Sequence, residues 1–151
     1  MGRVLFLCSG NIVRSPFAER YAALLVRRRG GTLAVESAGY QALDGYPVEA
    51  LMASELQARG GSAGGFRSRS LEAPMLEHAD LVLTMTLRQR HLIRSGWPFS
   101  QDRVHTLGLA GRVAERIGTV LGPAHLAEVL TERLDRLTPD DDIPDPYHRG
   151  P

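Results

Sequence analysis

The sequence is poor in cysteine, has no lysine, and lacks long apolar runs. Its 151 residues include one cysteine, so no internal disulfide can form, and no segment has the pattern of a secretory signal. A reducing, cytoplasmic location is therefore expected. Apolar runs such as 4–8 and 81–83 are far shorter than the roughly 20 residues of a membrane-spanning helix. No membrane association is expected.

An excess of charge of one sign is also missing. The 18 basic residues, all arginine, nearly balance 17 acidic residues. The chain therefore lacks the positive field that draws proteins to nucleic acid, which is not expected as a partner. The sequence shows no cluster of metal ligands, so we expect neither a metal nor an organic cofactor. Nothing in it indicates an oligomeric state.

Short apolar runs alternate with segments of helical periodicity. Strands are predicted at 4–7, 33–35, 81–83 and 104–107. Helices are predicted from residue 16 to the Gly30-Gly31 pair and at 48–57, 87–93, 113–121 and 124–137. This alternation is typical of an α/β fold. We predict one three-layer domain over residues 1–151, with a four-stranded parallel sheet flanked by helices and the strand at 4–7 in a central position.

The loop after the first strand has the composition of a phosphate-binding loop. Ligands bind at the carboxyl ends of parallel strands, where this loop lies. Gly and Asn tolerate left-handed backbone, so the amides can surround an anion, and the following helix adds its positive end. We predict that Cys8 is a nucleophile, that Arg14 binds two phosphoryl oxygens, and that Ser15 donates to the sulfur. The other expected substrate-binding residues of the loop are Ser9, Gly10, Asn11, Ile12 and Val13.

A cysteine that ends an apolar strand can also be a simple core residue. An arginine six positions after a cysteine is weak evidence alone. The Gly-Asn pair, the Ser-Pro pair and the change from strand to helix occur with it here, and together they favour the phosphate loop.

Residues 4–19 resemble the low-molecular-weight protein tyrosine phosphatases, whose loop reads Cys-x5-Arg-Ser-Pro after the first strand. The similarity extends to 36–39, 66–71, 79–85 and 143–147. The resemblance implies a phosphatase that hydrolyses protein phosphotyrosine through a cysteinyl-phosphate intermediate, with Asp145 as general acid and then base. A phosphotyrosine-containing protein is the implied partner, a bacterial tyrosine kinase being one candidate.

The same resemblance assigns roles to individual residues outside the catalytic set. It implies that Asn11 and Ser37 brace the loop, that Tyr147 lines the aryl pocket, and that Leu43 lies at the rim of the pocket, as in some bacterial members. The acidic residues 140–142, which precede the Asp-Pro-Tyr motif of Asp145, are interpreted as a solvated turn.

The sequence departs from the family pattern at several positions. Val13 replaces a second cysteine that many members use to protect the nucleophile in a disulfide. Phe66 replaces a histidine of the bracing network, and Thr86 replaces an aspartate. The segment 86–144 is longer than in eukaryotic members. The sequence stops at Pro151, where the family normally continues into a closing helix, so this helix is expected to be missing or replaced by different packing.

Three alternative functions are consistent with the same loop. An arsenate reductase resolved by an external thiol would not need Asp145. A phosphoarginine phosphatase would typically have threonine at the position of Ile12. A non-catalytic phosphate-binding protein could use the same fold.

Overall fold

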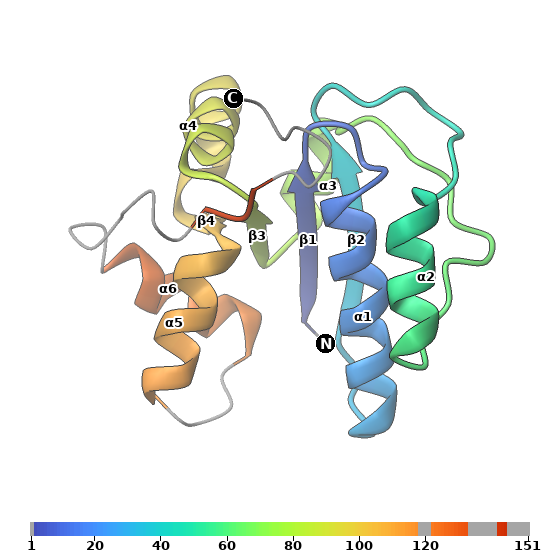
Figure 1. Cartoon of the computed structure of the whole chain (residues 1–151). Helices are drawn as coiled ribbons and strands as arrows, with labels where there is room; N and C mark the ends of the chain where they lie inside the picture. The colour runs from blue at the N-terminus through green and yellow to red at the C-terminus, as the bar shows by residue number, and fades with distance from the viewer. Residues whose placement is uncertain (1, 118–121, 133–141, 145–151) are drawn as a thin grey trace.

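The computed structural model describes residues 2–117, 122–132 and 142–144. Its four strands form one parallel sheet in the order β2-β1-β3-β4 (Figure 1). The predicted α/β fold with a four-stranded parallel sheet is confirmed, and β1 lies inside the sheet as expected. The strands are β1 Arg3–Cys8, β2 Ala34–Gly39, β3 Leu81–Thr84 and β4 Val104–Thr106.

Helices connect the strands and cover both faces of the sheet (Figure 1). None in the described ranges is long and apolar enough to cross a membrane. The α-helices are α1 Arg14–Arg28, α2 Ala50–Ala58, α3 Ala73–His78, α4 Leu87–Gly96, α5 Leu107–Ile117 and α6 Pro123–Thr131, and η1 Pro98–Arg103 is a 3-10 helix.

The structure corrects several predicted elements. Leu107, expected to end the fourth strand, is the first residue of α5, which begins well before the predicted start at 113. Sequence periodicity missed α3 and η1, each six residues long, because fewer than two helical turns give no readable period. The predicted helical positions 118–121 and 133–137 lie outside the described residues.

The first strand is buried on both sides, which explains its unbroken apolar sequence. Val4, Phe6 and Cys8 pack in one core cluster with residues of α5 and α6, and partly buried alanines of α1 join them. Leu5 and Leu7 pack on the opposite face with residues of α3 and α4. Because both faces are filled, the carboxyl end of β1 is a rigid support for the loop that follows.

Candidate active site

The loop from Cys8 to Arg14 connects the carboxyl end of β1 to α1. The carbonyls of Cys8, Ser9 and Ile12 accept hydrogen bonds from the amides of Tyr40, Gln41 and Glu49, at 3.2, 2.9 and 2.8 Å. In a trans peptide the C=O and the next N–H point in opposite directions. The amides that follow these three carbonyls are therefore directed away from the loops that surround the phosphate loop.

Two residues give the loop its tight path. Asn11 has a φ of 57°, the only positive φ among the described residues other than glycine. Gly10, the other residue expected to tolerate this conformation, does not adopt it. Gly39 is needed for space, because a Cβ there would lie 2.6 Å from the Ser9 carbonyl oxygen and 2.9 Å from the Asn11 nitrogen. The end of β2 can therefore lie directly against the loop.

The N-terminus of α1 directly follows the loop. Val13 is its N-cap residue and provides no side-chain hydrogen bond, and the first turn contains no acidic residue. The positive end of the helix dipole is therefore not offset by a carboxylate of its own first turn. Arg14, the first residue of the helix, donates from Nη1 to the Ile143 carbonyl at 2.8 Å. Its guanidinium thus lies between the loop and the chain just before residue 145.

A chain of hydrogen bonds with a defined direction ends at the Cys8 sulfur. Asn11 Nδ2 donates to Ser15 Oγ at 2.9 Å and to Ser37 Oγ at 3.0 Å. The Ser37 hydroxyl donates a hydrogen bond to the carboxylate of Glu19 at 2.9 Å. Since Ser15 accepts from Asn11, its hydroxyl proton is available to the sulfur 2.9 Å away. The backbone N–H of Asn11 also donates to this sulfur at 3.3 Å. Both contacts direct a hydrogen-bond donor at the Cys8 sulfur.

Outer contacts hold Glu19 in place. Its second oxygen accepts from Arg20 Nε at 3.0 Å, and Arg20 lies over the ring of Phe66, 5.6 Å from its centroid. Phe66 is buried, so the residue that replaces the expected histidine supports Arg20 by packing. Thr86, which replaces an aspartate, caps α4 by accepting from the Gln89 amide. Both departures from the family pattern therefore keep a structural contact.

Two contacts to the loop were not found from the sequence. The Arg69 amide donates to Asn11 Oδ1 at 2.9 Å, which fixes the orientation of the Asn11 amide. Gln89 is buried, and its Nε2 lies 3.4 Å from Ser9 Oγ. Thr86 and Gln89 have the spacing of a capping box, which was the available signal for a helix start. No pattern in the sequence indicated that Gln89 would contact Ser9, which is 80 positions away.

The mouth of the loop opens into a small, largely apolar cavity. A cavity of about 250 Å³ is lined by Gly10, Ile12, Gln41, Leu43 and Tyr46. Leu43 is 70% exposed and Tyr46 is 52% exposed, so their side chains form open walls beside the loop. Leu43 therefore lies near the predicted rim position, and Tyr46 was missed by the sequence analysis.

Hydrogen bonds hold the segment 43–46, which includes Leu43 and Tyr46, in place. Ser68 Oγ accepts from the Tyr46 amide at 2.9 Å and donates to the Leu43 carbonyl at 2.5 Å. Asp44 accepts from both the amide and the hydroxyl of Ser70, at 2.8 and 3.1 Å. The only carboxylate between Leu43 and Tyr46 is thus directed toward Ser70.

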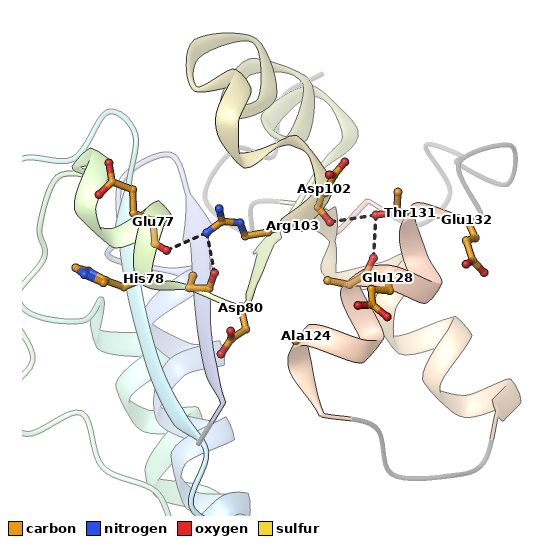
Figure 2. A pocket seen from close by; sticks show the side chains of 11 residues that line it. Glu77, His78, Asp80, Asp102, Arg103, Ala124, Glu128, Thr131 and Glu132 are labelled. Carbon is orange, nitrogen blue, oxygen red and sulfur yellow. Dashed lines mark hydrogen bonds between the residues drawn. The ribbon is translucent and has the colours of Figure 1, made fainter.

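A second cavity, of about 570 Å³, lies at the opposite edge of the sheet, where β3 and β4 begin (Figure 2). Acidic side chains predominate in its lining, and Arg103 Nη1 is directed at the carbonyls of Leu76, Glu77 and Ala79. Figure 2 shows this arginine joining η1 to the end of α3. No group of three or more metal-ligating side chains capable of holding an ion occurs in the described ranges.

Asp145 and Tyr147 lie outside the described residues, and the chain just before them is described. The prediction that residues 140–142 form a solvated acidic turn is wrong for Asp142. Its Oδ1 accepts from the Leu87 amide at 2.8 Å. This contact joins residues 55 positions apart and could not be read from local sequence.

The fold and the loop together define an α/β protein whose single cysteine lies where β1 meets the loop that leads to α1. The family model for "Low molecular weight phosphotyrosine protein phosphatase" matches residues 3–110, so the chain belongs to that family. A low-molecular-weight protein-tyrosine-phosphatase of Acinetobacter johnsonii is 31% identical over 105 residues, covering 70% of this chain and 71% of the relative.

Two further comparisons extend over more of the chain. A protein-arginine-phosphatase of Geobacillus stearothermophilus is 31% identical over 140 residues, covering 89% of this chain and 90% of the relative. The crystal structure of a low-molecular-weight protein tyrosine phosphatase from T. tengcongensis has a TM-score of 0.68 and 29% identity, covering 89% of this chain and 92% of that one. The chain is therefore a hydrolase of the protein-phosphatase type, and its relatives divide between phosphotyrosine and phosphoarginine.

Proposed function

We propose that this phosphatase hydrolyses phosphotyrosine in proteins through a cysteinyl-phosphate intermediate. The observation that carries the proposal is the directed hydrogen-bond chain from Asn11 through Ser15 to the Cys8 sulfur. It supplies a stabilised thiolate beside the N-terminus of α1, whose positive end attracts the phosphate.

The mechanism has two steps. The Cys8 thiolate attacks phosphorus while the P–O bond to the tyrosyl oxygen breaks, and Asp145 gives its proton to that oxygen. Water then attacks the phosphocysteine, Asp145 takes a proton from it, and inorganic phosphate leaves as the thiolate is restored. Arg14 and the loop amides bind the phosphoryl oxygens in both steps, and Ser15 stabilises the sulfur when it leaves.

The walls of the mouth favour an aryl group. Ile12, Leu43 and Tyr46 contribute apolar or aromatic surface, and no carboxylate lines the described part of this cavity. A tyrosyl ring would bury apolar area there, whereas a phosphoarginine side chain would bring a polar guanidinium that finds no acidic partner. This reasoning applies to the described residues, and Tyr147 is proposed as a further wall.

Phosphoarginine is the second candidate substrate, because the Geobacillus stearothermophilus arginine phosphatase matches 89% of the chain. Matched peptides that differ only in carrying phosphotyrosine or phosphoarginine separate the two. We expect kcat/KM to be at least ten-fold higher for the phosphotyrosine peptide. A preference in the other direction would replace phosphotyrosine with phosphoarginine as the substrate class.

Hydrolysis of para-nitrophenyl phosphate by wild type and by Cys8→Ser tests for catalysis. We expect turnover in the wild type without added metal or thiol and none in the variant. Phosphate binding without turnover by the wild type would indicate a binding protein. Arsenate reduction that depends on an added low-molecular-weight thiol, with no ester hydrolysis, would indicate a reductase.

Arg14→Lys tests the paired contact to phosphate. A single ammonium cannot bind two oxygens in the plane of a guanidinium, and it cannot keep the geometry of the contact to Ile143. We expect both Arg14→Lys and Arg14→Ala to lose more than about ten-fold in kcat/KM, which corresponds to about 1.4 kcal/mol. Near-normal activity of the lysine variant would rule out the paired contact.

A further inference from the structure

Three hydrogen bonds hold the chain immediately before Asp145. The Asp142 carboxylate accepts from the Leu87 amide, the Ile143 amide donates to the Met85 carbonyl, and the Ile143 carbonyl accepts from Arg14 Nη1, each at 2.8 Å. The Ile143 side chain also packs against the core cluster that contains Cys8. The segment 142–143 is thus fixed both to the start of α4 and to the arginine of the phosphate loop.

The start of α4 is itself joined to the phosphate loop. Gln89 Oε1 accepts from the amides of Met85 and Thr86 at 2.9 and 3.2 Å, and Gln89 Nε2 lies 3.4 Å from Ser9 Oγ. Leu87, which binds Asp142, therefore begins a helix with its own contact to the loop, and the Met85 amide is bound by the same glutamine.

The capping box does not bind the Leu87 amide. Thr86 Oγ1 accepts from the Gln89 amide, and Gln89 Oε1 bonds to the amides of residues 85 and 86. Leu87 is the first residue of α4, where amides have no partner within the helix and negative charge is favourable. The carboxylate of Asp142 meets both requirements.

We propose that Asp142 is a positioning residue for the general acid: by binding the first amide of α4, it fixes residues 142–143, which directly precede Pro144 and Asp145 in the chain, against α4 and Arg14. The proposal rests on the function proposed above. Two peptide units join Ile143 to Asp145, so their Cα atoms are at most about 7.6 Å apart. Fixing residues 142 and 143 therefore limits where the acid can be. Asp142 itself does not touch the substrate.

The test compares substrates that differ in their need for a proton. Phenolate is a strong base and leaves slowly unless it is protonated, whereas para-nitrophenolate is a stable anion near neutral pH. We would measure kcat/KM for phenyl phosphate and for para-nitrophenyl phosphate with wild type, Asp142→Ala, Asp142→Asn and Asp145→Ala. The ratio of the two values does not depend on the fraction of folded enzyme, so a loss of stability alone leaves it unchanged.

We expect Asp142→Ala to lose about 10- to 100-fold on phenyl phosphate, a substantial part of the 10²- to 10⁴-fold contribution of a general acid, and less than 3-fold on para-nitrophenyl phosphate. Asp142→Asn keeps an oxygen that can accept from Leu87, so it should stay within about 3-fold of wild type on both substrates. Glu128→Ala, an exposed charge of α6 in the lining of the opposite cavity, is the matched control and should leave both values unchanged.

Three outcomes would overturn the proposal. An equal loss on both substrates in Asp142→Ala would mean that Asp142 acts on folding or on the loop as a whole. Wild-type values on both substrates in Asp142→Ala, beside a clear change in the ratio for Asp145→Ala, would remove the positioning role and leave the general acid in place. If Asp145→Ala itself leaves the ratio unchanged, the acid assigned in the proposed function is wrong, and the positioning role is withdrawn with it.

Discussion

The two halves of the sheet differ in whether their buried polar side chains all have hydrogen-bond partners. Beside β1 and β2, the side chains of Asn11, Ser15 and Ser37 are almost completely buried, and each has hydrogen-bond partners. Beside β3 and β4, Arg90 and His105 are also buried, but Nε and Nη2 of the arginine and Nδ1 of the histidine have no partner among the described residues.

This difference in pairing distinguishes the Asn11 network from Arg90 and His105, which are buried but keep unpaired polar atoms. In a low-dielectric interior a fully paired network rigidifies its members, while an unpaired polar atom reduces stability. The hydrogen bonds of the Asn11 network run in one direction and end with a donor hydroxyl directed at the Cys8 sulfur. Arg90 and His105 have no such order and, within the described part of the chain, make no hydrogen bond to the phosphate loop. The fully paired network therefore lies beside β1, at the loop that begins at Cys8.

Asn11→Ala should show the largest effect, because it removes the centre of the paired network. Ser15 and Ser37 would each lose a donor, and the Arg69 amide would lose its acceptor. Each buried group left unpaired costs about 1–3 kcal/mol. We expect the free energy of unfolding to fall by about 2–4 kcal/mol and kcat/KM on para-nitrophenyl phosphate to fall at least 100-fold. The measurements are urea unfolding and steady-state kinetics.

Ser62→Ala is a suitable control for this variant, since Ser62 is exposed and its hydroxyl accepts only from the nearby Gly64 amide. It should change both quantities little. If Asn11→Ala kept a tenth of the activity or more, the network would be a packing feature like the buried groups near β4, and the comparison between the two halves would lose its functional meaning.

Gly39→Ala should have a smaller effect on the same side of the sheet. The added Cβ would lie 2.6 Å from the Ser9 carbonyl oxygen, so the loop must shift, and overpacking of this kind costs about 1–3 kcal/mol. We expect a loss of stability in that range and a reduced kcat/KM. Gly96→Ala is the control because it has no atom within 4 Å of its new Cβ. Equal behaviour of the two variants would show that close packing at Ser9 is unimportant.

The predicted fold followed largely from local pattern. The apolar run of β1 and the periodicity of α1 and α4 lie within single elements, and the structure confirms these elements with boundary shifts of a few residues. The loop between β1 and α1 was also readable, because its residue types and its position after a strand are local properties. Leu107 was assigned to a strand because it extends a short apolar run, and its role as the start of α5 depends on packing with β3 and β4.

The contacts that organise the site were not readable from local pattern. Arg69 binds Asn11 from 58 residues away, and Asp142 binds Leu87 from 55 residues away. A solvated turn was a reasonable interpretation for three consecutive aspartates, because only tertiary structure brings a helix N-terminus to one of them. Tyr46 was missed because an exposed aromatic residue in a loop has no periodicity to distinguish it.

The smallest predicted effect concerns His105, the buried histidine of β4. Burial lowers its pKa below the usual value of about 6.5, with a further lowering by nearby Arg94, while the Asp102 carbonyl, 3.2 Å from Nε2, opposes the shift. In the folded state the ring therefore stays neutral at pH values where the unfolded chain takes up a proton. Protonation of His105 therefore has no effect on the free energy of unfolding well above pH 6.5. As the pH falls below 6.5, the unfolded state gains the proton first, and the folded state loses stability by at most about 1.4 kcal/mol per pH unit.

We therefore expect the free energy of unfolding of the wild type to decline between pH 7.5 and 5.5 by about 1 kcal/mol more than that of His105→Gln. The glutamine has a similar size, can donate to the Asp102 carbonyl and does not titrate in this range. Urea unfolding of both proteins at several pH values measures the difference, and groups common to both cancel. Parallel declines would mean that the ring is protonated in the folded state as easily as in the unfolded chain. Burial without a partner at Nδ1 would then impose no penalty on the charge, and the contrast drawn between the two halves of the sheet would hold for geometry but not for energetics.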